Sequence, residues 1–261
     1  MKRLNATIGK ISLATALLAS SPASATPVNF MIEYLGVPST AAWVERDLVT
    51  HAQEAMEENA GMGTLGLRLG VGVPVELDPF TLCVETGVGL PAGTRTFAHS
   101  LMVRSTAGAT REQKNDGDFT EWEVTTVPLM FKVRYLPPAD GITLGGDIGL
   151  GPVLLGVSTD RTIAKYDSSD NLLLRETENW NETMLAMAVE INGGVVVPVS
   201  SSLRVELMGT IMWMSKVPAG RVRDYPRPTA VYGYTADDPA APALQLGGIG
   251  YGARVGLTAG L

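Results

Sequence analysis

Residues 127–135 read VPLMFKVRY, and the alternation within this stretch decides the fold. Its apolar side chains fall on every second position: Val127, Leu129, Phe131, Val133 and Tyr135. The opposite face carries Lys132 and Arg134. Successive side chains of a β-strand point to opposite faces. The stretch therefore predicts a strand with one apolar and one charged face, which suits a wall between lipid and a polar interior.

The same period of two recurs along the chain and predicts eight strands. They cover residues 28–36, 61–75, 80–91, 121–136, 143–157, 184–199, 202–215 and 246–261. Several are longer than the usual globular strand of about 5–6 residues and reach the roughly 9–11 residues that a tilted strand needs to cross a bilayer. A strand at 96–104 (TFAHSLMVR) is an alternative that would change the count.

The connections between the predicted strands alternate between short and long. The short ones are 76–79, 137–142 and 200–201, and the long ones are 37–60, 93–120, 158–183 and 216–245. Outer-membrane barrels have short periplasmic turns, long extracellular loops and an even number of strands. The sequence therefore predicts an all-β chain that forms an eight-stranded antiparallel up-and-down transmembrane β-barrel.

The first long connection also shows a helical spacing. Trp43, Leu48 and Ala55 recur near the helical period among acidic residues, which predicts a short helix at about 40–59. Whether such a helix enters the lumen is left open by the sequence.

The N-terminal segment predicts that the chain is exported from the cytoplasm. The first 25 residues combine Lys2, Arg3 and Lys10 with a short apolar run and small residues before Thr26, as a signal peptide does. We expect cleavage near Ala25 and a barrel domain at 26–261. The net charge of −7, without a basic run, argues against nucleic acid as a partner.

Charged residues on the face opposite the apolar one form a balanced set of acids and bases. This set comprises Glu33, Arg68, Glu85, Lys132, Arg134, Asp147, Glu190, Arg204, Glu206 and Arg254. An eight-stranded barrel is about wide enough for side chains to fill it. We therefore expect a buried ionic network, because charges inside a protein are tolerated when each finds a partner. The alternative is that these residues line a narrow ion path.

Aromatic residues near the strand ends predict an interfacial girdle. Trp122 and Tyr135 bracket the fourth predicted strand, and Trp213 lies near the end of the seventh. Outer-membrane barrels carry such aromatic residues at both edges of the apolar band.

Four stretches resemble the small outer-membrane barrels of the OmpW, OmpX and OmpA-transmembrane-domain type. They are VPLMFKVRY, TLGGDIGLGPVLLG (143–156), LRVELMG (203–209) and the closing GYGARVGLTAGL (250–261). The resemblance implies the outer membrane of a Gram-negative-type bacterium, with its lipid, lipopolysaccharide and barrel assembly machinery as partners. That family usually ends on an aromatic residue, whereas this chain ends on Leu261.

The sequence offers little catalytic or metal-binding chemistry. His51, His99 and the single Cys83 lie in no metal-ligand spacing, so we expect no metal or cofactor. His99 and Ser100 are adjacent, and neighbouring strand residues point to opposite faces, which argues against a catalytic pair. One cysteine also excludes an intramolecular disulfide.

The function expected from these features is that of a non-enzymatic barrel with a filled lumen. It would act in envelope structure, or in surface interaction with an extracellular ligand through its loops. Three alternatives remain open: a narrow channel for small or hydrophobic solutes, as the OmpW resemblance implies, a lipid A-modifying enzyme, and a soluble lipocalin-like barrel with an internal ligand.

Overall fold

The computed structural model describes residues 26–46, 53–59, 61–74, 79–93, 95–101, 116–136, 141–166, 172–219 and 243–260. The predicted signal peptide, His51 and Leu261 lie outside these residues. Within the described part of the chain, no helix is long and apolar enough to cross a membrane.

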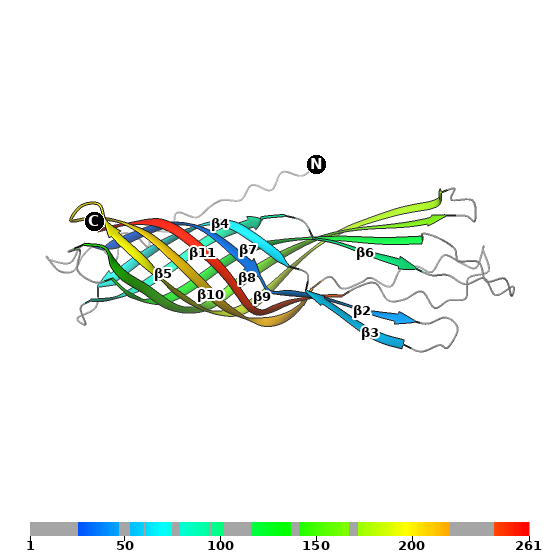
Figure 1. Ribbon diagram of the computed structural model, residues 1–261, viewed down its shortest axis with the longest axis horizontal. Helices are drawn as coiled ribbons and strands as arrows, with labels where there is room; N and C mark the ends of the chain where they lie inside the picture. The colour runs from blue at the N-terminus through cyan, green and yellow to red at the C-terminus, as the bar shows by residue number, and fades with distance from the viewer. Residues whose placement is uncertain are drawn as a thin grey trace, which may run out of the picture.

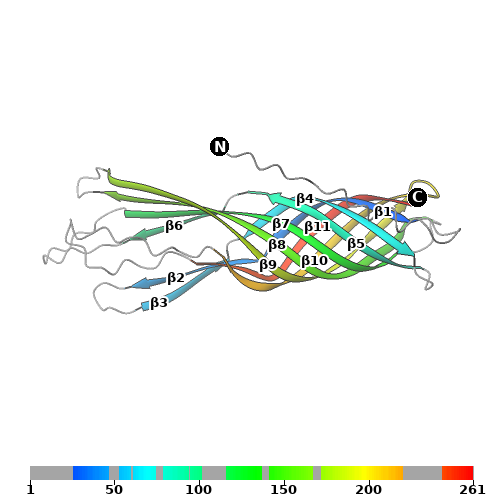
Figure 2. The same cartoon turned by 180° about the vertical axis from the view of Figure 1, so that it is seen from behind.

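Eight strands form the barrel wall. They are β1 (Pro27–Val37), β4 (Met62–Pro74), β5 (Phe80–Pro91), β7 (Asp116–Tyr135), β8 (Thr143–Tyr166), β9 (Leu172–Pro198), β10 (Leu203–Ala219) and β11 (Ala243–Gly260). The order around the wall is β1-β4-β5-β7-β8-β9-β10-β11, and β1 also pairs with β11. Each pairing is antiparallel, and the β1–β11 pairing closes the ladder on itself, which confirms the predicted eight-stranded barrel (Figures 1 and 2).

Three further strands lie beyond the barrel wall. β2 (Ser39–Arg46) and β3 (Gln53–Asn59) form a hairpin, so the prediction of a helix at about 40–59 is wrong. β2 continues β1 beyond Pro38 and pairs with the start of β11, and this ladder overrides the helical spacing. β6 (Arg95–Leu101) confirms a strand within 96–104, but it pairs with β7 alone and adds no strand to the closed wall.

Several strands continue far past one end of the barrel. β8 runs to Tyr166 and β9 starts at Leu172, so most of the loop predicted at 158–183 is paired strand. The hairpins β2–β3 and β8–β9 extend from the same end (Figure 1). β1 begins and β11 ends at the opposite end, where Pro27 faces Gly260.

The outer face of the wall is an apolar band of limited height. On β7 the outward residues from Val127 to Tyr135 are apolar and exposed, whereas Glu121 and Glu123 are the exposed residues beyond them. The band thus covers nine residues of this strand, close to the roughly 9–11 residues of a tilted membrane-spanning strand. Apolar residues outside and charged residues inside also argue against the soluble lipocalin-like alternative.

The first prediction tests the band. Phe131 lies at its middle and is 54% exposed. We expect Phe131→Arg to lower the free energy of unfolding by about 2–4 kcal/mol, because arginine there must enter lipid. The measurement is urea unfolding of the protein folded into lipid vesicles.

Thr183→Arg is the matched control, since Thr183 is exposed and points outward on β9 beyond the band. It should leave the unfolding curve unchanged. An equal loss in both variants would show that the band does not contact lipid.

Candidate functional site

Every strand of the barrel wall sends at least one charged side chain inward. The buried set comprises Glu33, Arg68, Glu85, Lys132, Arg134, Asp147, Glu190, Glu206 and Arg254. Arg204, the tenth residue of the predicted network, is half-buried at the start of β10. The structure thus brings nine of the ten residues into the interior.

Arg254 and Lys132 connect the residues at the centre of this set. We name these central residues the central charge network; they are Glu33, Arg68, Glu85, Lys132, Asp147, Glu190 and Arg254. The Arg254 guanidinium lies 3.0 Å from Glu33 Oε1 and 3.4 Å from Glu85 Oε1, and it also pairs with Glu190. Lys132 Nζ contacts the same Glu85 and Glu190 carboxylates at 2.8 and 2.6 Å. Each cation is therefore shared among several carboxylates, which offsets much of the cost of burying charge.

The ion pairs cross the lumen. Arg68 on β4 approaches Glu190 on β9, with Nη2 and Oε2 4.0 Å apart. These strands are four places apart in a ring of eight, so the two side chains come from opposite walls. Arg254 and Glu85 likewise come from strands three places apart. Contacts of this kind are possible only where side chains fill the interior.

Two glycines make room for the network. Gly149 lies between Lys132 and Glu190 in the ladder, and the two charged side chains meet across it. A Cβ atom on Gly149 would lie 2.6 Å from Lys132 Cγ. Gly70 separates Asn29 from Glu85 in the same way, and Asn29 Nδ2 donates to Glu85 Oε2 across it at 3.2 Å.

Neutral polar residues complete the polar half of the lumen. Asn192 Nδ2 donates to Asp147 Oδ1 at 2.5 Å, and Thr210 Oγ1 donates to Asn192 Oδ1 at 2.6 Å. Thr258 bridges Arg134 and Glu206, which also contact each other directly. These amides and hydroxyls were not predicted as part of the network, although they lie on the same strand face as the charges.

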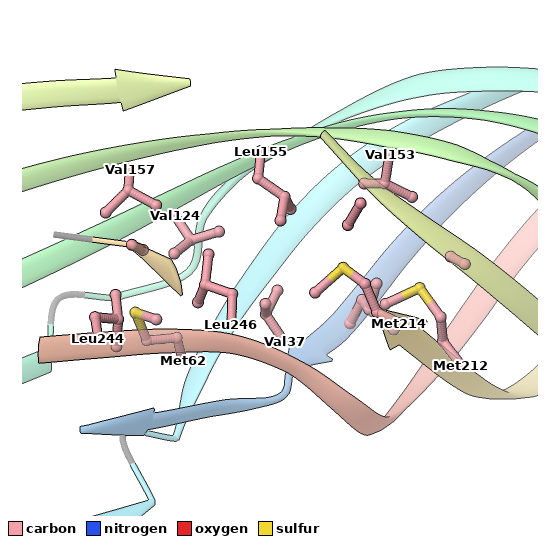
Figure 3. Packing of buried hydrophobic residues seen from close by; sticks show 14 of the residues in the cluster. Val37, Met62, Val124, Val153, Leu155, Val157, Met212, Met214, Leu244 and Leu246 are labelled. Carbon is pink, nitrogen blue, oxygen red and sulfur yellow. The ribbon is translucent and has the colours of Figure 1, made fainter. Parts of the chain in front are cut away.

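Beyond the charge network, toward the hairpins, the interior is apolar. We name this part the apolar layer; it comprises Leu35, Val37, Ala41, Met62, Trp122, Val124, Met130, Val153, Leu155, Val157, Ala186, Ala188, Met212, Met214, Ala219, Leu244 and Leu246. Figure 3 shows its side chains converging from several strands. This layer was not predicted from the sequence, because the apolar residues of the inner face share strands with the charges that define that face.

The apolar layer corrects the predicted girdle. Trp122 is only 1% exposed and packs in this layer, so its placement at the membrane surface is wrong. Trp122, Lys132 and Arg134 all occupy even-numbered positions of β7, and the even-numbered side chains of this strand point into the barrel. Tyr135 and Trp213 lie on the outer face and are exposed, and Tyr135 packs against Phe80 with ring centroids 5.6 Å apart. A girdle role for these two residues stays a prediction.

The closed ladder, apolar band and charged interior together identify the architecture. The protein is an outer-membrane-type β-barrel. Among the described residues, no group of three or more histidine, cysteine or acidic side chains is arranged to hold a metal. His99 lies on β6, outside the barrel wall, and His51 lies outside the described residues.

No family model matches the sequence of this barrel, and no curated protein matches it. Among solved structures, the outer membrane protease OmpT from Escherichia coli is similar at 10% identity and a TM-score of 0.45, over 93% of this chain and 100% of that one. Ail, the attachment invasion locus protein of Yersinia pestis, is similar at 10% identity and a TM-score of 0.29, over 88% of this chain and 99% of that one. Neisserial surface protein A is similar at 7% identity and a TM-score of 0.29, over 87% of this chain and 96% of that one. The barrel assignment rests on the ladder that joins β1 to β11.

The second prediction concerns Arg254. Arg254→Met keeps a long side chain but removes the cation that contacts Glu33, Glu85 and Glu190 together, so the buried network loses one positive charge. We expect the free energy of unfolding to fall by about 3–5 kcal/mol, as when one partner of a buried pair is removed. Urea unfolding in vesicles measures this change.

Lys216→Met removes a charge from an exposed position on β10 and serves as the control. It should change the unfolding free energy by less than about 0.5 kcal/mol. Equal stability of the Arg254→Met variant and the wild-type barrel would refute the shared-cation arrangement.

The third prediction concerns Gly149. Gly149→Ala forces a methyl group against Lys132, and we expect it to destabilise the barrel by about 1–3 kcal/mol. Gly193→Ala on the outer face is the control, because an added Cβ there meets nothing within 4 Å. Comparable thermal unfolding of the two variants would show that Lys132 does not need the space above Gly149.

Proposed function

We propose that this protein is a non-enzymatic outer-membrane barrel with a closed lumen. It acts in envelope structure or surface interaction through the hairpins at one end. The observation that carries the proposal is the series of ion pairs between opposite walls, of which Arg68–Glu190 and Arg254–Glu85 span the lumen.

Two different barriers stand in series along the lumen. An ion that enters the central charge network must separate pairs whose members are buried, which leaves unpaired charges at high cost. An ion in the apolar layer would lose its water without gaining polar contacts, as in channels that close by dewetting. Either layer opposes conduction, so both must fail for a path to open.

The location and partners follow from the same features. The apolar band would contact outer-membrane lipid, with lipopolysaccharide beside the extended hairpins, in a Gram-negative-type bacterium. The start of β1 and the end of β11 would face the periplasm, since a chain with eight spanning strands returns to the side from which it entered. Insertion by the barrel assembly machinery after cleavage near Ala25 completes this proposal.

The fourth prediction is that the purified, folded protein shows no openings in planar lipid bilayers. Removing a whole ion pair with Glu33→Ala and Arg68→Ala weakens one layer, and Trp122→Ala weakens the other. We expect either change alone to stay closed, because the second barrier remains. The combination of all three substitutions should produce openings, measured as current steps.

Trp213→Ala on the outer face is the control for the loss of a tryptophan. Regular openings of the wild-type barrel would overturn the closed-lumen proposal and favour the narrow channel. Altered lipid A in cells that overproduce the protein would overturn its non-enzymatic character.

A further inference from the structure

The barrel wall parts between β9 and β10 where the hairpins begin. The β9–β10 ladder ends at Ala188 and Met214. Farther from the barrel, β9 stays paired with β8 on one side, and no other described strand lies along its second side. A register shift after Met214 leads β10 along β11 instead. The β8–β9 hairpin therefore diverges from the β2–β3 hairpin and leaves β9 with a long free edge (Figures 1 and 2).

The backbone groups of the odd-numbered β9 residues point to this free edge. Met187 N–H donates to Ser215 Oγ of β10 at 2.9 Å. Backbone groups alternate between the two sides of a strand from one residue to the next. The N–H groups of Asn181 and Thr183 thus point the same way, beyond the end of the β9–β10 ladder. Such a row of groups on an edge strand is a template for a further strand.

The exposed side chains along the edge are polar and uncharged. They are Thr177, Asn179, Asn181 and Thr183, on the outer face beyond the apolar band. Edge strands commonly avoid association through lysine or proline, and residues 172–187 contain neither. Threonine hydroxyls and asparagine amides bond well to their own kind across neighbouring strands. The edge therefore suits a partner strand of the same composition.

We propose that this free edge pairs antiparallel with the same edge of a second copy of this chain. A two-fold axis at Asn181 sets Asn181 opposite its own copy and Asn179 opposite Thr183. It also sets Glu182 opposite Trp180 rather than opposite another glutamate, so no like charges face each other there. The inference rests on the proposed surface interaction and names its partner.

Antiparallel pairing determines where the second copy lies. β9 runs from the hairpin toward the opposite end of the barrel, so an axis perpendicular to β9 lies nearly in the membrane plane (Figure 1). Two copies related by such an axis extend their hairpins toward each other from two membranes. Two copies in one membrane are instead related by an axis along the membrane normal, which would make the two β9 strands parallel. Pairing through this edge therefore joins two opposed membranes.

The test uses the full folded chain in lipid nanodiscs that hold one barrel each. Asn181→Cys places two thiols at the axis, where paired Cα atoms lie within the roughly 4.4–6.8 Å that a disulfide needs. Thr183→Cys is the matched control, because its two copies lie about 13 Å apart, four residues at roughly 3.3 Å each. We expect oxidised glutathione to cross-link the first variant and leave the second monomeric. The native Cys83 is buried in the barrel.

A second measurement tests the backbone. Asn181→Pro removes an N–H at the free edge and spares the β8 ladder, since proline is tolerated where the N–H side of an edge strand is unpaired. It should weaken association at least about tenfold, because the axis removes each hydrogen bond twice. Energy transfer between two labelled populations of nanodiscs measures this change. Asn181→Ser keeps the N–H and should associate like the wild-type protein.

Electron microscopy of the cross-linked dimers should show two nanodiscs facing each other with the hairpins between them. A heat-dependent gel shift confirms that each variant is folded. Equal cross-linking of both cysteine variants, nanodiscs joined side by side, or wild-type nanodiscs that stay separate overturns the pairing. The closed-lumen proposal is judged separately by bilayer currents, so the two ideas fail independently.

Discussion

The shared contact of Arg254 with Glu33, Glu85 and Glu190 is the interaction on which the rest of the barrel depends. These four side chains come from β11, β1, β5 and β9, so they tie together strands spread around the whole wall. A slip of one residue in any of these strands would turn its charge to the outer face and its apolar face inward. The network therefore acts together with the apolar band to fix the register of the sheet.

The charge network and the apolar layer occupy successive parts of one lumen, and the apolar layer begins within the apolar band, where Met130 points inward between the exposed Leu129 and Phe131. Along β7, Lys132 and Arg134 point inward while their neighbours are apolar and face outward. Farther along the same strand, Trp122 and Val124 point inward while Glu121 and Glu123 are exposed. At the charge network the wall has a polar interior, and beyond the band it has an apolar interior with charges outside, as in a soluble β-protein. One continuous ladder carries both arrangements.

This inversion explains how much of the structure the sequence could predict. The eight strands of the wall were predictable because apolar side chains on one face and charges on the other give a strong period of two, and the same alternation identified nine buried charges. Trp122 was misplaced because an aromatic residue at a strand end was interpreted without the inversion. The β2–β3 hairpin depends on pairing with β11, about 200 residues away, which local spacing does not reveal. The strands within 158–183 are rich in polar residues and so lack the regular apolar face of the segments that were predicted.

On another side of the wall, β10 carries a β-bulge next to the apolar layer. On β10 the inward residues are even-numbered up to Met214, and the register against β11 then shifts before Val217. The extra residue turns Lys216 outward, where it is exposed, and turns Ala219 into the apolar layer. Opposite this bulge, Gly247 has a φ of 117° and donates its N–H to the Pro38 carbonyl at 2.9 Å. Without the bulge, an unbroken alternation would place Lys216 among the side chains of the apolar layer, so this irregularity keeps the layer free of an unpaired charge.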